Sequence, residues 1–155
     1  MRASALCINP WIYDFAAYDL WVRPLGLLTI ASSLRRCGLE VDFLDCLDRS
    51  PNEAENLPRK GRPSHDDYGC GHYRKQPVAT PSVLEDVERL FKRYGISPDI
   101  FERRLDELGR PDIILVTSGM TYWYPGVFDV ISRVKRRWPD TPVVLGGVYA
   151  ALCRD

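Results

Sequence analysis

Two segments of the chain each run an apolar strand into an aromatic loop and then into a helix. The first starts at residues 4–8 and continues through Trp11; the second starts at residues 112–117 and continues through Tyr122 and Trp123. Strand, helix and strand in close succession form a right-handed βαβ unit with parallel strands. The loops that follow the strands of an open α/β sheet gather at its carboxyl edge, where such folds bind ligands. The pattern therefore predicts an α/β fold with a candidate binding site at that edge.

The length and the charge balance of the chain limit the number of domains and the kinds of partner to be expected. At 155 residues the chain can form one domain with a substantial core. Its balance of 21 basic and 21 acidic residues argues against nucleic acid or an anionic membrane as the main partner, since both select a basic face. Its apolar stretches are too short to span a bilayer, and its N-terminus lacks a signal-peptide core. Five irregularly spaced cysteines do not suggest a disulfide framework. We therefore expect a cytoplasmic protein that binds neither nucleic acid nor membranes.

The first βαβ unit is predicted from periodicity. Residues 4–8 should form a buried strand, and a helix should begin near Pro24, whose fixed φ suits a first turn. Residues 40–45 should form the next strand. The helix is expected to bury an apolar face spaced i, i+3, i+4 and i+7, consisting of Leu27, Ile30, Ala31 and Leu34.

The second unit follows the same plan. Strands are expected at residues 112–117 and 142–147, with a helix between them whose basic residues Arg133–Arg137 form a solvated face. The chain ends where a further helix should begin, and parallel sheets normally carry helices on both faces. We therefore expect a fragment of a longer protein. The buried face of the helix between the strands is predicted to contain Val127, Val130, Ile131, Val134 and Trp138.

Residues 47–109 read as an insertion that consists of a loop, 47–80, and two helices. The loop is rich in proline, glycine and charge, and loops of that length are usually functional or disordered. Ser97-Pro98-Asp99 predicts one helix, with Phe101, Leu105 and Leu108 buried. A capping box at Ser82–Glu85 predicts the other, with an inward face of Val83, Leu84, Val87, Leu90, Phe91 and Tyr94.

Two clusters in the insertion have more than one interpretation. Soft ligands at His65, Cys70, His72 and Cys46 could hold a metal ion, although their spacing matches no standard zinc site, or they could belong to a polar loop. A second group could hold a phosphate or a substrate, or could form a solvated linker. It consists of Arg62, Tyr68, Tyr73, Arg74 and Lys75.

The block PLGLLTIASSLRRCGLEV, from Pro24 to Val41 and followed by Asp45, resembles a specific family. It is similar to the N-terminal cobalamin-binding-like domain that precedes the barrel in B12-binding radical S-adenosylmethionine (SAM) proteins. The resemblance covers residues 4–46 and 112–153 and leaves the insertion unexplained. We accordingly expect residues 1–155 to form one cobalamin-binding-like domain. Its fold should be a flavodoxin- or Rossmann-like parallel sheet of order 2-1-3-4, with the last strand missing and helices on both faces.

Cobalamin-binding domains carry three sequence marks, of which this chain has two. Ser118-Gly119-Met120 resembles their Ser-x-Leu, with methionine for leucine, and Gly146-Gly147 resembles their paired glycines. A serine hydroxyl can bond the buried tail of the cofactor, and glycine permits close backbone approach. The third mark, Asp-x-His-x-x-Gly, is missing, because the only histidines are His65 and His72.

The resemblance implies a module that presents cobalamin, without histidine ligation, to a downstream radical SAM domain in cis. A 4Fe-4S cluster and S-adenosylmethionine would belong to that domain, since the Cys-x-x-x-Cys-x-x-Cys signature is absent from this chain. The intact protein would be an enzyme, and we expect no catalytic residue here. The alternatives are a cofactor-free docking or substrate-recruiting domain and a nucleotide- or flavin-binding domain. The expected cofactor-binding residues are Asn9, Pro10, Trp11, Leu25, Gly26, Ser118, Gly119, Met120, Thr121, Gly146 and Gly147.

Overall fold

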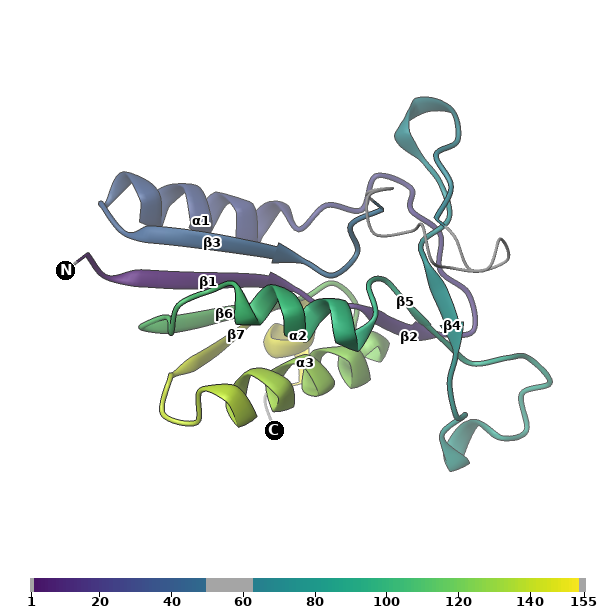
Figure 1. Cartoon of the computed structure of the whole chain (residues 1–155). Coiled ribbons are helices and arrows are strands. Elements are labelled where there is room, and N and C mark those ends of the chain that lie inside the picture. Colours follow the sequence, from purple (N-terminus) through teal and green to yellow (C-terminus); the bar gives the residue numbers. More distant parts are fainter. Residues whose placement is uncertain (1, 50–62, 154–155) are drawn as a thin grey trace.

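The computed structural model describes residues 2–49 and 63–153 as an α/β fold with two sheets. The larger sheet is parallel and has four strands, and the smaller sheet is antiparallel and has three. The smaller sheet lies beyond the end of β1 in the larger one (Figure 1). Within the described residues, no helix is long and apolar enough to cross a membrane.

The parallel sheet places the two βαβ units side by side. Its strand order is β3-β1-β6-β7, and Ala5 of β1 pairs with Val41 on one side and Ile113 on the other. The predicted parallel α/β sheet is thus confirmed, with boundaries within two residues of those expected. The strands are β1 (Ser4–Asn9), β3 (Glu40–Asp45), β6 (Ile113–Ser118) and β7 (Val143–Gly147).

Alternate residues of β1 pack against different helices, because successive side chains of a strand point to opposite faces. Leu6 and Ile8 belong to a core cluster that includes Phe101 of α2 and Val130 of α3. Ala5 and Cys7 instead pack in a cluster with α1. The helices are α1 (Leu25–Arg36), α2 (Pro98–Asp106), α3 (Tyr124–Arg137) and α4 (Val148–Leu152).

The helix beginning near Pro24 is confirmed as α1, but its buried face is narrower than predicted. Leu27 and Ala31 are buried, whereas Ile30 is 46 % exposed. One residue corresponds to about 100° around a helix, so Ile30 lies to one side of the stripe that contacts the sheet. The prediction that Ile30 faces the core is therefore wrong.

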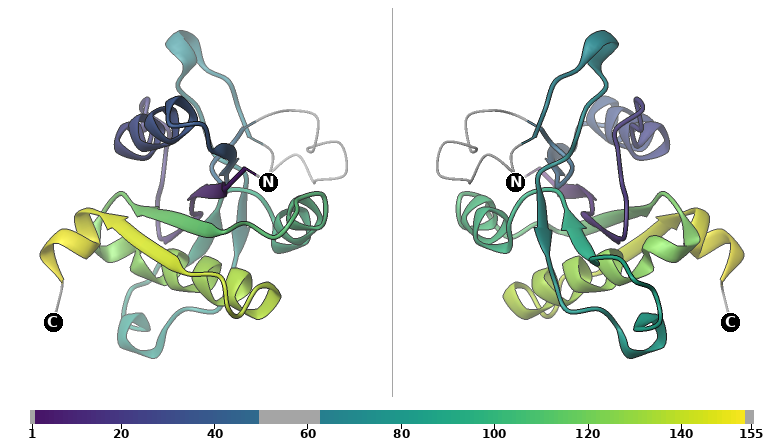
Figure 2. Two further views of the ribbon diagram at one scale, coloured as in Figure 1. Left: turned by 90° about the vertical axis from the view of Figure 1, so that its left-hand side faces the viewer. Right: turned by 90° about the vertical axis from the view of Figure 1, so that its right-hand side faces the viewer.

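The insertion contributes most of the second sheet, whose strand order is β2-β5-β4. Figure 2 shows the loops on either side of β4 extending in opposite directions. Residues 50–62 of the predicted loop 47–80 lie outside the described residues. The strands are β2 (Ile12–Asp14), β4 (Lys75–Pro77) and β5 (Lys92–Tyr94). The single-turn helices among the described residues are η3 (Asp67–Gly69), η4 (Ser82–Leu84) and η5 (Thr121–Trp123).

The helix predicted from Ser82 to Tyr94 is wrong. Only the turn η4 forms there, and Val83 and Leu90, expected inward, are 87 % and 65 % exposed. Phe91 and Tyr94 are buried because the segment pairs as β5 between β2 and β4. Strand pairing thus overrides a local helix signal. The second predicted helix is confirmed as α2, where the Ser97 hydroxyl accepts from the Ile100 amide at 3.3 Å.

Trp11 joins the two sheets and the helices next to them. Its buried ring meets Phe101 of α2 edge-on at 5.2 Å between centroids. The guanidinium groups of Arg93 and Arg133 lie over the same ring, at 5.8 and 5.4 Å from its centroid.

The basic residues of α3 also depart from the prediction. Arg133 pairs at 3.0 Å with both Glu102 and Asp129, and Arg137 pairs with Asp106 at 2.7 Å. The prediction that Arg133–Arg137 form only a solvated face is therefore wrong, since these cations connect α3 to α2 and to the ring of Trp11.

Substitution of two leucines tests this arrangement of the insertion. Leu105→Ala removes a fully buried side chain and should lower the free energy of unfolding by about 2–5 kcal/mol. Leu90→Ala, at an exposed site, should change it by no more than about 0.5 kcal/mol. Urea denaturation followed by tryptophan fluorescence measures both. A large loss for Leu90→Ala would support the predicted helix instead of β5.

Candidate functional site

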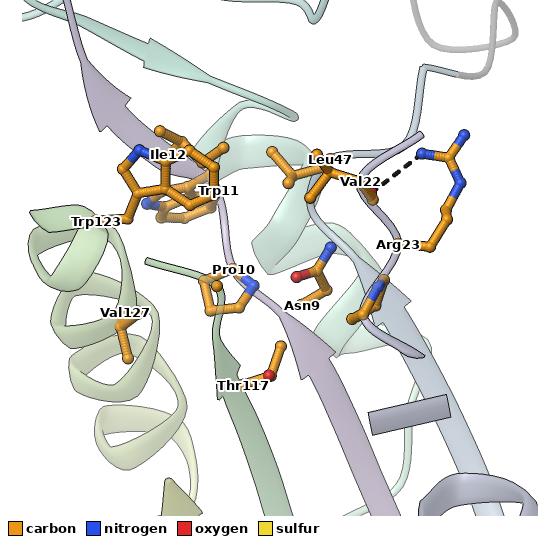
Figure 3. A pocket seen from close by; sticks show the side chains of 12 residues that line it. Asn9, Pro10, Trp11, Ile12, Val22, Arg23, Leu47, Thr117, Trp123 and Val127 are labelled. Carbon is orange, nitrogen blue, oxygen red and sulfur yellow. Dashed lines mark hydrogen bonds between the residues drawn. The ribbon is translucent and has the colours of Figure 1, made fainter. Parts of the chain in front are cut away.

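A small cavity of about 70 Å³ lies at the carboxyl edge of the parallel sheet, where β1 and β6 end (Figure 3). Residues from both aromatic loops line it, so the two loops do meet at one edge as predicted. The volume accommodates a few water molecules and is well below that of a typical ligand pocket. The lining includes Asn9, Pro10, Trp11, Thr117, Gly119 and Trp123.

The two aromatic loops bond partly to each other. The Trp123 indole donates to Asp14 at 3.0 Å, and the Tyr13 hydroxyl donates to Asp129 at 2.8 Å. Gly126 permits this close approach, since a Cβ there would lie 2.1 Å from the Trp11 carbonyl oxygen. The side chains of Tyr13 and Trp123 thus hold α3 and the loop before it against β2.

Other apolar side chains of these loops remain exposed and form what we call the apolar rim. Val22 lines the cavity, and the remaining members lie just before α1, at its first residue, or after β6. Contiguous exposed apolar side chains commonly mark binding surfaces. The rim consists of Trp21, Val22, Leu25, Met120 and Tyr122, which are between 42 and 71 % exposed.

The predicted site residues fall into three groups. Asn9, Pro10, Trp11 and Gly119 line the cavity. A second group lies beside the cavity on the first turn of α1 and in the loop after β6, and consists of Leu25, Gly26, Met120 and Thr121. The third group, Ser118, Gly146 and Gly147, joins β6 to β7.

Ser118 is buried, and its hydroxyl is engaged within the protein. It donates to the Gly146 carbonyl at 2.9 Å and accepts from the Tyr149 amide at 3.0 Å, so it joins β6, β7 and the start of α4. Gly147 has a φ of +91°, and a Cβ there would lie 2.3 Å from the Ser118 carbonyl oxygen. The crevice expected between these strands is therefore closed by backbone contact.

Gly146 differs from its neighbour. Its φ is not positive, and nothing lies within 4 Å of the position of a Cβ. This glycine leaves open surface at the end of β7, on the same edge as the cavity.

Asp45 is a polar residue of this edge that follows the block carrying the resemblance but is not among the predicted cofactor-binding residues. It ends β3, and its Oδ1 accepts from the Asn9 amide at 2.8 Å and from the Leu47 backbone at 2.9 Å. Burial raises the pKa of Asp45, since these bonds and the charge of Arg23 only partly offset the loss of water. Its place at the carboxyl end of the strand next to β1 was the signal available in the sequence.

A second, more polar cavity of about 230 Å³ adjoins the first and shares Arg23 and Leu47 with it. The buried Asp19 carboxylate lies in its wall and pairs with Arg23 and Arg49, both at 3.0 Å. Arg49 also donates to the carbonyls of Ser64, Gly69 and Cys70. Arg49 therefore holds the loop around η3 against the edge of the sheet.

The metal site considered for the insertion does not form. Cys46 is fully buried in the core, where desolvation raises its pKa well above the usual value. The ring of His72 packs edge-on against the ring of Tyr18, with 4.8 Å between the ring centroids, and His65 lies beside the guanidinium group of Arg49. Across residues 2–49 and 63–153, no three histidine, cysteine or acidic side chains are grouped to hold a metal ion.

The proposed phosphate-holding group is also dispersed. Tyr73 and Arg74 are buried, whereas Tyr68 is exposed at the tip of η3. Arg62 lies outside the described residues. Neither a shared phosphate site nor a fully solvated linker describes these residues, because Tyr73 and Arg74 are buried whereas Tyr68 is exposed.

Comparisons of the chain with protein-family models, with curated proteins and with solved structures find no significant match. The function is therefore inferred from the geometry of the edge, together with the resemblance in the sequence.

Two neighbouring glycines test the closed contact between β6 and β7. Gly147→Ala should lower the free energy of unfolding by at least about 2 kcal/mol, because it forces a positive φ on alanine and a clash with Ser118. Gly146→Ala should change it by no more than about 0.5 kcal/mol. Chemical denaturation measures both variants, and equal effects would contradict the closed contact.

Asp45 should give the stability a specific pH dependence. Because its pKa is higher in the folded than in the unfolded state, its ionisation costs stability as the pH rises through the folded pKa. Asp45→Asn removes that cost and keeps an Oδ1 acceptor for Asn9 and Leu47. The variant should gain stability relative to the wild type between about pH 4 and about pH 7.

Urea denaturation at the two pH values measures this gain. Asp42→Asn, at an exposed site on the same strand, is the matched control, because it makes the same substitution away from the bonds to Asn9 and Leu47. A gain that is the same at both pH values would contradict an elevated pKa for Asp45.

Proposed function

We propose that the chain is the cobalamin-binding-like module of a radical SAM protein and that a corrinoid lies across the carboxyl edge of its parallel sheet. The observation that carries this proposal is the apolar rim, which borders the cavity between β1 and β6 on the edge that also holds the open surface of Gly146. A large planar ligand with apolar faces needs such a surface. The resemblance of Pro24–Val41 and of Ser118-Gly119-Met120 supports the same assignment.

The fold assigned to this module is flavodoxin-like, with helices on both faces of the sheet. The order β3-β1-β6-β7 supports it, and so does the packing of α1 in a different cluster from α2 and α3. In such a sheet the crossovers reverse direction between β1 and β6. The cavity lies at this switch point, where doubly wound folds hold their ligands.

The residues present fit one part of a corrinoid better than the other. The macrocycle fits the edge, since the rim is apolar and Gly146 leaves space above β7. The nucleotide tail does not fit between β6 and β7, because the Ser118 hydroxyl already bonds to Gly146 and Tyr149 and Gly147 contacts the Ser118 backbone. We therefore place the macrocycle on the edge and leave the tail outside this crevice.

In this proposal the chain positions the ligand and excludes water from one of its faces. A bound corrinoid supplies cobalt chemistry, which in a radical SAM protein is radical transfer or methylation. The loop from residue 10 to residue 23 contains no histidine, so cobalt receives no imidazole from the usual place. The iron–sulfur cluster and S-adenosylmethionine are assigned to a further domain in cis.

A docking module that binds no cofactor is the second candidate. The closed contact between Ser118 and Gly147 favours it, because this contact uses the groups that would otherwise hold the tail. In this alternative the apolar rim packs against a partner domain, as aromatic side chains commonly do at interfaces.

A titration of the chain with hydroxocobalamin and with cobinamide, which lacks the nucleotide tail, distinguishes the candidates. We expect saturable one-to-one binding by calorimetry and by the corrin absorption bands. Cobinamide should bind within about threefold of cobalamin, since the tail makes no contact in the crevice. Spectra without a shift to imidazole ligation would agree with the missing histidine.

Two glycine variants provide the matched control. Gly146→Trp places a ring over the open surface and should weaken binding at least about tenfold. Gly109→Trp, at another open glycine on the opposite edge, should leave binding unchanged. Absence of binding to either corrinoid overturns the cobalamin proposal and leaves the docking module in its place.

A further inference from the structure

Two hydrogen-bonding groups at the second cavity are not used within the described part of the chain. Both bonds to Asp45 end on Oδ1, so its Oδ2 is a free acceptor. Arg23 makes all its bonds through Nη1, to Asp19 and to the Val22 carbonyl, so its Nε and Nη2 are free donors. Both residues line this cavity.

The other charged groups of the cavity are engaged. Asp19 accepts from Arg23, Arg49 and the Val22 amide, and Arg49 is the anchor of the η3 loop. His65 lies against the carbonyl and the guanidinium group of Arg49. Asp48 lies 3.6 Å from Arg104. The cavity therefore offers one acceptor and one donor group to a ligand.

The geometry connects this pair to the apolar edge. Arg23 lines both cavities, and the bond from Asn9 to Asp45 links the end of β1, in the first cavity, to the end of β3, in the second. Figure 3 shows the guanidinium group of Arg23 directed away from Pro10 and Thr117. A ligand on the edge can thus place a polar substituent beside Asp45 and Arg23.

We infer that Asp45 and Arg23 select a primary amide over a carboxylate on the ligand, an inference that rests on the proposed corrinoid function. An amide matches the pair, because its N–H donates to Asp45 Oδ2 and its carbonyl accepts from Arg23. A carboxylate offers no donor to Asp45 and brings a like charge next to it. The macrocycle of cobalamin carries primary amides at its periphery, so the pair determines which corrinoid binds.

Competing titrations with cobinamide and with cobyrinic acid, its counterpart with peripheral carboxylates, test this selection by calorimetry on the same protein. The wild type should bind cobinamide at least about tenfold more tightly than cobyrinic acid, because one well-placed hydrogen bond to a charged group has an effect of that size. Asp45→Asn keeps the acceptor for Asn9 and Leu47 but replaces the free Oδ2 with a donor. The variant should bind cobinamide more weakly and cobyrinic acid more tightly. The ratio of its affinity for cobinamide to its affinity for cobyrinic acid should therefore fall at least about tenfold.

The control and the outcomes separate this inference from the proposed function. Asp42→Asn, exposed on the same strand, should leave the ratio unchanged. Equal binding of both corrinoids, or a ratio that Asp45→Asn does not alter, overturns the selection by Asp45 while the corrinoid function stands. Absence of binding by either corrinoid overturns the function and the inference together.

Discussion

The burial of Trp11 is the constraint on which the rest of the structure depends. Trp11 lies between β1 and β2, and its indole contacts α2 through Phe101, while the cations of Arg93 from β5 and Arg133 from α3 lie over its ring. A buried aromatic ring contributes a large apolar area, and a guanidinium group over its face adds electrostatic attraction. One side chain thus fixes the second sheet relative to the first. The cavity at the carboxyl edge forms between elements whose positions depend on this contact.

The carboxyl edge combines an apolar surface with a polar boundary. The apolar rim provides the surface area that a planar ligand needs. The carboxylates of Asp19 and Asp45 and the guanidinium group of Arg23 lie at one side of it, where they would orient the ligand. The closed contact between Ser118 and Gly147 leaves no crevice between β6 and β7 at this edge. Binding at this edge would consequently be a matter of surface complementarity, with little of the ligand enclosed.

The candidate site could be predicted from the sequence only in part. Position after a parallel strand indicated Asn9, Pro10, Trp11 and Gly119, because that rule depends on topology alone. The role of Ser118 could not be predicted, since its partners are Gly146 and Tyr149, which approach it only after β7 has paired with β6. The joining of Asp45 and Arg23 at one cavity could not be predicted for the same reason, because distant segments form that cavity.

Sequence patterns alone predicted the parallel α/β sheet, the helices α1, α2 and α3, and the edge where the two aromatic loops meet. These features follow from local periodicity and from the handedness of βαβ units, which a single chain encodes in its pattern of apolar residues. Three features became evident only in the folded chain: Lys92–Tyr94 is a strand, Arg133 lies over Trp11, and the crevice at Ser118 is closed. Each of these depends on partners far away in the sequence, and long-range pairing overrides local propensity wherever the two compete.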